Sequence, residues 1–371
     1  MKRFLLNTAL VSLVALACGR TPGSDTGIVI TEASGITRHG NKLIIVGDDA
    51  DGRYFEIEID DWSSCLIPID PLKVNEIPLE HGDFAMDLEA IDILSDGRVA
   101  VLSEQLHCLI AAENPGSTRH MVVAEYERIL NEFGHRGLEG LAVTDGEDGA
   151  SRIAVLWEGG YPIFENVPPQ IRDRVGRIPL KPIVVVHTIP RGSSVGAVST
   201  GAHLITLDVP EPEGEVPYVQ RFRATDLVWF FQKEDGRLRE EFIVLLNSEN
   251  SPPDGEGISK TYERKILQRF DLEGNPVGKP LDLTNTTKRL LYGVSEEDRT
   301  RMGGKMAAHL DRIISILEES SWEQINWEGL GWFEEGVRLV AIYDGYPMDP
   351  PFAFVIDIPA EWRRIRSNSG R

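Results

Sequence analysis

The chain has 371 residues, with 59 acidic and 38 basic side chains and a formal net charge of −21. This balance argues against a nucleic-acid partner, because such binding needs a basic surface and no basic cluster stands out. Metal cations are the partners that such a charge favours.

The N-terminus predicts an export signal. Two basic residues precede an apolar run over residues 4–17, which is too short to span a bilayer and is typical of a signal peptide. Cys18 resembles the acylated cysteine of bacterial lipoproteins, and residues 18–27 would form a flexible tether. Ala15 stands where Leu is usual, so simple cleavage after residue 17 is the alternative. We expect export and a lipid anchor in the bacterial cell envelope.

Residues 28–360 are predicted to form one domain, followed by a C-terminal tail at 361–371. Strand-like runs begin with Ile28-Val29-Ile30, which we expect to complete the last unit of a closed ring. Residues 65–79 would supply an outer edge of the first unit, where their prolines are tolerated.

One short motif recurs along this domain. An oxygen-bearing residue precedes a small or polar residue and then an aliphatic one, at the start of a strand-like run. The copies are Ala33-Ser34-Gly35-Ile36, Leu88-Glu89-Ala90-Ile91, Leu138-Glu139-Gly140-Leu141, Ala224-Thr225-Asp226-Leu227 and Trp327-Glu328-Gly329-Leu330. After a turn each copy leads into a second run, and these runs end at Asp48-Asp49, Glu104, Glu158, Glu249 and Asp344. Imperfect copies of one hairpin indicate a repeat architecture.

The hairpin geometry predicts the fold. Antiparallel strands bring the start of the first strand beside the end of the second, so radial copies would place a ring of oxygen-bearing residues and a second acidic ring around one axis. We therefore predict an all-β fold, a five-bladed β-propeller. A sixth blade would fit the long interval between Thr225 and Glu328, although no sixth motif occurs there. Either water fills this acidic channel or a hard cation binds in it.

A helical insertion is predicted before the last blade, over residues 292–321. Ser295 begins a capping-box pattern, and apolar residues from Met302 to Leu317 recur at helical spacing. Gly303 and Gly304 weaken the first turns of this helix.

Besides Cys18, the chain has two cysteines, Cys65 and Cys108. An even pair in an exported chain is consistent with a disulfide, and two separately buried thiols are the alternative.

The motifs ASGI, DLEAID, GLEGLAV and NWEGLGW resemble the exported phytase-like (esterase-like) β-propellers of bacteria. The order Ser, Glu, Glu, hydroxyl, Glu also resembles calcium-dependent apyrases, five-bladed propellers with one calcium on the axis. This resemblance implies that Ca²⁺ is held by Ser34, Glu89, Glu139, Thr225 and Glu328. Calcium accepts six to eight oxygen ligands in adaptable geometry. In the fourth blade, Asp226 or a backbone oxygen is an alternative to Thr225.

The second acidic ring supplies the catalytic candidates. They are Asp48, Asp49, Glu104, Glu158 and Asp344, with Asp51, Glu249, Asp254 and Glu256 nearby. Such carboxylates can hold a second cation that activates water for phosphoester hydrolysis. Alternatively, Asp in these Gly-containing turns serves only the turn. Few basic side chains lie near the motifs: Arg38, Arg53, Arg136, Arg223 and Lys260.

Other catalytic motifs are disfavoured. Ser194 lies in a G-x-S-x-G match at 192–196, but the following residues do not predict the helix that a serine-hydrolase elbow requires. The eight His residues show no zinc-like spacing.

We therefore predict an exported calcium-binding propeller that hydrolyses phosphoesters, as phytases and nucleotidases do. The alternative is a non-catalytic propeller of the cell envelope, which binds a ligand or protein partner and uses calcium only for structure. We expect a monomer that contacts the membrane only through its lipid anchor.

Overall fold

The structure is a computed structural model. It describes residues 28, 30, 32–48, 52–59, 65–80, 87–126, 137–159, 181–192, 202–210, 220–234, 237–250, 265–320, 325–343 and 352–363. The predicted signal peptide and Cys18 lie outside these residues, as do Asp49, Asp51, Asp254, Glu256, Asp344 and the side chain of Glu249.

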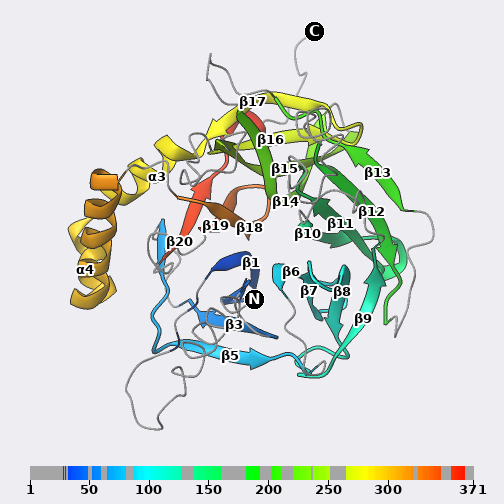
Figure 1. The fold of residues 1–371 in the computed structure, drawn as a ribbon, viewed down its shortest axis with the longest axis horizontal. Coiled ribbons are helices and arrows are strands. Elements are labelled where there is room, and N and C mark those ends of the chain that lie inside the picture. Colours follow the sequence, from blue (N-terminus) through cyan, green and yellow to red (C-terminus); the bar gives the residue numbers. More distant parts are fainter. Residues whose placement is uncertain are drawn as a thin grey trace, which may run out of the picture.

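The described residues form five four-stranded antiparallel sheets around one axis (Figure 1). Blade 1 contains β1 (Ala33–His39), β2 (Lys42–Gly47), β3 (Arg53–Glu58) and β5 (Val74–Pro78). Blade 2 contains β6 (Leu88–Ile93), β7 (Val99–Ser103), β8 (Cys108–Ala112) and β9 (His120–Glu125). Blade 3 contains β10 (Leu138–Asp145), β11 (Ser151–Trp157), β12 (Ile183–Ile189) and β13 (His203–Thr206).

Blade 4 contains β14 (Gln220–Glu234), β15 (Arg237–Asn250), β16 (Lys265–Asp271) and β17 (Pro276–Asp282). Blade 5 contains β18 (Trp327–Glu334), β19 (Arg338–Tyr343), β20 (Phe352–Asp357) and β4 (Leu66–Pro68). The prediction of a five-bladed β-propeller is confirmed, and the long interval before Glu328 adds helices to the described chain, not a sixth sheet.

The ring closes differently from our prediction. β4 pairs with β20 as the outermost strand of blade 5, whereas Ile28 only donates its backbone N–H to Pro71 O at 2.8 Å. Residues 65–79 are therefore shared: β4 completes blade 5 and β5 completes blade 1. The outer edges of these two neighbouring blades lie close enough for one short segment to serve both.

Each pair of neighbouring blades shares one hydrophobic core. In β2, Leu43 and Ile45 pack towards blade 5, while Ile44 and Val46 pack towards blade 2. Successive strand residues point to opposite faces of a sheet, so a blade between two others needs apolar residues on both faces. This explains why the second strand of each blade is a continuous apolar run.

The Gly or Ala that follows the bulge residue in blades 1, 2, 3 and 5 lets the inner strands approach one another at the axis. A Cβ atom on Gly35 would lie 2.7 Å from Ala90 Cα, and one on Gly140 would lie 2.9 Å from Asp226 Cα. The strands β1, β6, β10, β14 and β18 are thereby neighbours around a closed ring. The repeated small residue is a packing requirement.

Two carboxylates connect the blades, the buried Asp226 and the half-buried Asp92. Asp226 accepts backbone N–H groups from Leu141 (3.3 Å), Leu227 (2.8 Å) and Leu330 (2.6 Å), which belong to blades 3, 4 and 5. Asp92 accepts from Thr37 Oγ1 at 3.0 Å in blade 1 and from the N–H of Val143 at 2.7 Å in blade 3. Asp226 is therefore a link between blades, which gives it a structural role in place of the alternative metal-ligand role.

Helices cover the outer side of blades 4 and 5. α3 (Leu283–Tyr292) follows β17, and α4 (Glu296–Ser320) stands beside the ring (Figure 1). The capping prediction is confirmed, because Ser295 Oγ accepts the N–H of Asp298 at 3.1 Å, and Gly303 interrupts the helical dihedrals at φ 79°. α3 was not predicted, because the expected helical insertion began at residue 292.

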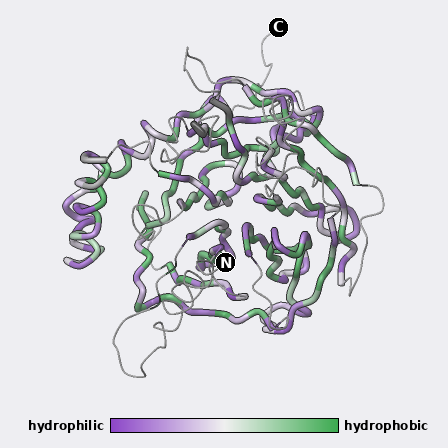
Figure 2. The backbone as a smooth tube through the Cα atoms, in the orientation of Figure 1, coloured by the Kyte–Doolittle hydropathy of each residue, from purple (hydrophilic) through white to green (hydrophobic). Residues whose placement is uncertain are grey.

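Hydrophobic and hydrophilic residues alternate along α4 (Figure 2), and Leu310 and Leu317 join the core shared by blades 4 and 5. The chain continues past residue 360 as α5 (Ala360–Arg363), whose Trp362 is buried in that core. None of the helices in the described ranges is both long and apolar enough to span a membrane.

Of the two alternatives for Cys65 and Cys108, the structure has two free thiols and no disulfide between them. Cys65 is exposed and precedes β4 of blade 5, whereas Cys108 is buried and begins β8 of blade 2. Blade 1 separates these two blades around the ring, so the second alternative, two separate thiols, is the observed one, although only Cys108 is buried.

Candidate cation site on the propeller axis

A β-bulge presents each predicted ligand. In all five inner strands the pairing register skips one residue, and the skipped residues are Ser34, Glu89, Glu139, Thr225 and Glu328. A bulge leaves its extra residue unpaired and redirects its side chain. The motif found in the sequence is therefore a bulge at the inner end of each blade, followed by the small residue that packs at the axis.

The pairing register defines two further sets of equivalent positions. Two residues before the bulge lie Glu32, Asp87, Gly137, Arg223 and Asn326. At the end of the second strand lie Asp48, Glu104, Glu158, Asn247 and Asp344, the last outside the described residues. In blades 1, 2 and 3, the backbone N–H of the second set donates to the carbonyl of the first, as Asp48 does to Glu32 at 2.9 Å.

This register corrects one predicted member of the second acidic ring. Asn247 pairs with Arg223 and occupies the equivalent position in blade 4, whereas Glu249 lies two residues further along and pairs with Arg221. Glu249 was predicted because it is the first acidic residue after the apolar run of the fourth copy. Blade 4 therefore has Arg223, Thr225 and Asn247 where other blades have mostly acids.

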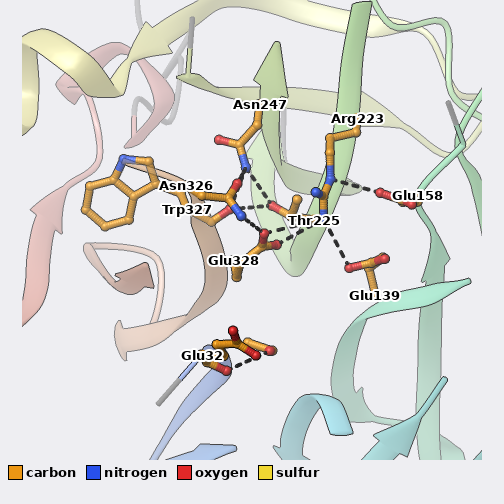
Figure 3. Close-up of polar contacts among 10 residues, drawn as sticks. Glu32, Glu139, Glu158, Arg223, Thr225, Asn247, Asn326, Trp327 and Glu328 are labelled. Atoms are coloured by element: carbon orange, nitrogen blue, oxygen red, sulfur yellow. Dashed lines mark hydrogen bonds and ion pairs between the residues drawn. The ribbon is translucent and has the colours of Figure 1, made fainter. Parts of the chain in front are cut away.

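Arg223 lies among carboxylates from the two blades that flank it (Figure 3). Its Nε is 2.9 Å from Glu158 Oε2, and its Nη2 is 3.6 Å from Glu139 Oε2 and 3.4 Å from Glu328 Oε1. The Arg223 side chain is only 12 % exposed. Burial and the charge of Glu158 raise the pKa of Glu139, and Arg223 opposes this rise.

Thr225 and Asn247 both hydrogen-bond the backbone of blade 5. Thr225 Oγ1 donates to the Trp327 carbonyl at 2.9 Å, and Asn247 Nδ2 donates to the same carbonyl at 2.5 Å. Asn326 Nδ2 donates to Glu328 Oε1. In blade 1, Ser34 Oγ donates to the carbonyl of Glu32 at 3.1 Å.

The five bulge residues therefore do not fit one axial calcium as the resemblance implied. Glu139 and Glu328 contact the Arg223 guanidinium, which therefore lies between two of the five predicted ligands. A guanidinium and a Ca²⁺ ion cannot both lie between the same carboxylates. The five residues share the bulge position of their inner strands, and their role as calcium ligands stays a prediction.

A second arrangement does fit a divalent ion. One oxygen each from Asp48, Asp87 and Glu89 lies within 4.8 Å of the others, at the edge between blades 1 and 2. Glu89 is only 8 % exposed, and no hydrogen bond or ion pair holds it among the described residues. Asp48 is exposed, so the cluster opens to solvent on that side. Hard oxygen ligands with open positions suit Ca²⁺.

The carboxylates of this cluster and the nearby Glu104 repel one another when no cation is bound. A hydrogen bond to Asp87, burial and the charge of Asp87 raise the pKa of Asp48 from 3.8 to about 7. Burial and the charges of Asp87, Glu158 and Asp48 raise the pKa of Glu104 to about 8. Burial, followed by repulsion from Glu139 and Asp48, raises the pKa of Glu89 well above its ordinary value. A bound cation would relieve this repulsion.

These pKa values predict a pH dependence of stability in calcium-free protein. Glu104 binds its proton more tightly when folded, so its contribution is fully present below the ordinary value of 4.5 and is lost as the pH rises through about 8. The Glu104→Gln variant lacks this titration, so its stability advantage over wild type is expected to grow between pH ~5 and ~9. Urea denaturation at several pH values measures this, and a constant difference contradicts it.

Asp87 and Asn247 are not among the residues predicted from the sequence, and Arg223 was predicted only as a basic residue near the motifs. Asp87 and Arg223 share one signal, a charged residue two positions before the bulge residue. This position lies just before the first residue of the repeated motif, so the motif does not include it. Asp87 adopts a left-handed backbone conformation at φ 43°.

Comparisons with known proteins add little to this description. No family model matches the chain, and no curated protein sequence matches it either. Among solved structures, an endo-arabinase from Bacteroides thetaiotaomicron is similar at 9 % identity, covering 91 % of this chain and 98 % of that chain, with a TM-score of 0.42. A putative gluconolactonase matches at 11 % identity, 90 % of both chains and a TM-score of 0.36. Regucalcin, a calcium-binding protein from Agrobacterium tumefaciens, matches at 10 % identity, 90 % of this chain, 92 % of that chain and a TM-score of 0.37. The fold assignment rests on the strand order of the chain itself.

Proposed function

We propose that this protein is a calcium-binding β-propeller that hydrolyses phosphoesters at the face where Asp48, Asp87 and Glu89 meet. The observation that supports this most is the approach of their three carboxylate oxygens to within 4.8 Å. Buried Glu89 would supply the ligand at the base of the site, and exposed Asp48 the ligand at its rim.

The chemistry follows from the ligand type. When bound there, Ca²⁺ would neutralise phosphoryl oxygens and orient water. Asp87 and Glu89 lie at the start of β6, and Asp48 follows β2 of the neighbouring blade. The propeller therefore fixes their relative positions. The open side at Asp48 is where a substrate oxygen would complete the coordination.

A substrate screen tests this proposal. Purified protein is assayed on nucleotides, phytate, an aryl phosphate and an aryl carboxylic ester, with Ca²⁺ and with a chelator. We expect phosphoester turnover only with Ca²⁺, and a fall of ~100-fold in Asp48→Asn, because loss of a metal ligand costs at least what loss of an outer-shell partner costs. The matched control is Asp271→Asn, a surface aspartate in the β16–β17 turn. Ester cleavage that persists with the chelator would contradict the proposal.

One observation favours a second candidate, a propeller that binds a partner and uses calcium only for structure. Arg223, the basic side chain that the described residues place on the axis, already contacts Glu139, Glu158 and Glu328. Enzymes that bind phosphate usually present Arg or Lys to the substrate. Intact calcium binding without turnover on any substrate would support this second candidate.

We also propose that the protein acts outside the cytoplasm and is held at the membrane by a lipid anchor. This rests on residues 1–18 of the sequence. Labelling of the expressed protein with a radioactive fatty acid, lost in Cys18→Ala, is the measurement that checks it.

A further inference from the structure

A histidine lies in the apolar core between blades 2 and 3. His187 belongs to β12, in which Val185 and Ile189 pack into this core while Val184 and Val186 pack towards blade 4. Alternate residues of a strand share one face of the sheet, so the His187 side chain faces blade 2. Because His187 is only 5 % exposed, a group that can carry a charge is enclosed between two blades.

His187 is an exception within the repeat. Counted along the pairing register from the bulge residue, it lies opposite Ile153 in the third strand of its blade. The same position holds Ile57 in blade 1, Phe270 in blade 4 and Ile356 in blade 5. All three are buried and apolar. The propeller fold therefore does not require a polar residue at this position.

One hydrogen bond joins His187 to the neighbouring blade. Tyr126 follows β9 of blade 2, and its Oη lies 2.8 Å from His187 Nε2. Tyr126 is itself 8 % exposed and belongs to the core shared by blades 2 and 3. When the imidazole is neutral, the phenol donates to Nε2 and the proton of the ring is on Nδ1. Nδ1 is buried and has no hydrogen-bond partner among the described residues.

This arrangement suits a neutral imidazole better than a charged one. Both nitrogens of a charged imidazole are donors, so Tyr126 would have to accept. Its own O–H and the Nδ1–H of His187 would then have no acceptor within the described part of the chain. Burial also lowers the pKa of His187 from 6.5 to about 4, because the charged form is poorly solvated there.

Neighbouring charges do not offset this effect of burial. The titratable groups of blades 2 and 3 that can act on the pair are Asp96, Arg98, Cys108, Glu125, Asp145, Arg152, Arg191 and His203. Arg98 pairs with Asp96, Arg152 contacts Glu240 in blade 4, and the Cys108 thiol acts on Tyr126. Within the described ranges, burial lowers the pKa of His187 and no charged group contributes.

We propose that His187 and Tyr126 form an acid-sensitive joint between blades 2 and 3, which holds while the imidazole is neutral and loosens when it binds a proton. Acid would loosen this joint before the joints whose equivalent position is apolar. The inference does not depend on the proposed function, because the joint contains none of the candidate cation ligands.

Urea denaturation of wild type and His187→Ile tests the inference. The folded pKa of His187 is lowered, so its contribution to stability is fully present above 6.5 and is lost as the pH falls to about 4. His187→Ile lacks this titration. The ratio of the unfolding constants, wild type over variant, is therefore expected to rise ~100-fold between pH ~7 and ~4. A constant ratio would overturn the inference.

The matched control is Val186→Ala. Val186 is a buried neighbour of His187 in the same strand and faces blade 4. The substitution removes core contacts but no titratable group, so its cost should be the same at every pH. A cost that changes with pH as steeply as the effect of His187→Ile would show that blade 3 loosens in acid without the histidine, which would also overturn the inference.

Hydrogen exchange locates the effect. At pH ~4.5, the amides of β9 and β12 are expected to exchange faster in wild type than in His187→Ile, while those of β16 in blade 4 exchange equally in both. Equal exchange in β9 and β12, or an increase spread over all blades, would contradict a local joint.

NMR of isotope-labelled histidines in wild type decides the case if His187→Ile does not fold. One of the eight histidines is expected to stay neutral at pH ~5 and to shift in Tyr126→Phe, because both properties follow from the buried hydrogen bond. The inference fails if every histidine is charged at this pH, or if the neutral one does not respond to Tyr126→Phe.

Discussion

Replacing Asp226 with Ala is expected to destabilise the propeller by ~3 kcal/mol or more. The substitution leaves the backbone N–H groups of Leu141, Leu227 and Leu330 without their acceptor. Each buried donor without a partner costs ~1–3 kcal/mol. The loss is offset in part, because burial raises the pKa of Asp226 well above its ordinary value and the carboxylate is itself poorly solvated. Chemical denaturation measures the change.

The destabilisation by Asp226→Ala should weaken the contacts between neighbouring blades more than the strand pairing within any one blade. Asp226 belongs to blade 4, but two of its donors belong to blades 3 and 5. Hydrogen exchange in Asp226→Ala should therefore increase first in β10 and β18, the inner strands that lose this link.

The matched control for Asp226 is Asp271→Ala. Asp271 also accepts backbone N–H groups, from Glu273 at 3.1 Å and Asn275 at 2.8 Å, but it lies in a surface turn. Water can replace it there, so a loss under ~1 kcal/mol is expected. Equal losses in the two variants would show that the connection between blades contributes nothing.

The second large effect is expected from Glu89→Gln. This substitution preserves shape but removes the buried carboxylate of the candidate calcium site. We expect calcium affinity to fall by ~100-fold or more, because even partners outside the coordination shell contribute ~10–100-fold. Isothermal titration with Ca²⁺ measures this change directly.

Glu89→Gln should at the same time stabilise the calcium-free protein. Burial and the charges of neighbouring carboxylates raise the pKa of Glu89, so its ionised form opposes folding above the ordinary pKa of a glutamate. A neutral amide lacks this repulsion. The variant should therefore unfold at a higher temperature than wild type without Ca²⁺, and gain less on its addition.

Glu335→Gln is the control for Glu89→Gln. Glu335 is exposed in the turn after β18, so the same change in charge should alter neither calcium affinity nor the response of the unfolding temperature to Ca²⁺. Wild-type calcium affinity in Glu89→Gln would rule out the candidate site.

Repetition made the blade count predictable. The bulge residue and the apolar second strand recur in each copy, and Gly or Ala follows the bulge in every blade except blade 4, which has Asp226. Each blade must pack closely at the axis and bury both of its faces. The helix α4 was predictable for a similar local reason, since its cap and its apolar spacing lie within one segment.

The ring closure and the partners of the axial side chains were not predictable in this way. Short strands such as β4 carry no signal of which sheet they join, and only its pairing with β20 assigns it to blade 5. The sequence pattern favours Glu249, the first acidic residue after the apolar run of blade 4. The pairing register instead places Asn247 at the position equivalent to the acids of the other blades.

The sequence by itself determined the repeat, the number of blades and the residues that face the axis, because these follow from periodic local patterns. Only the tertiary structure decided which carboxylates share a charge partner. Arg223 is 84 residues from Glu139 and 105 from Glu328 in the chain, yet its guanidinium contacts both. Charge pairing depends on distances of a few ångströms between blades, and the spacing of residues along one strand does not contain those distances.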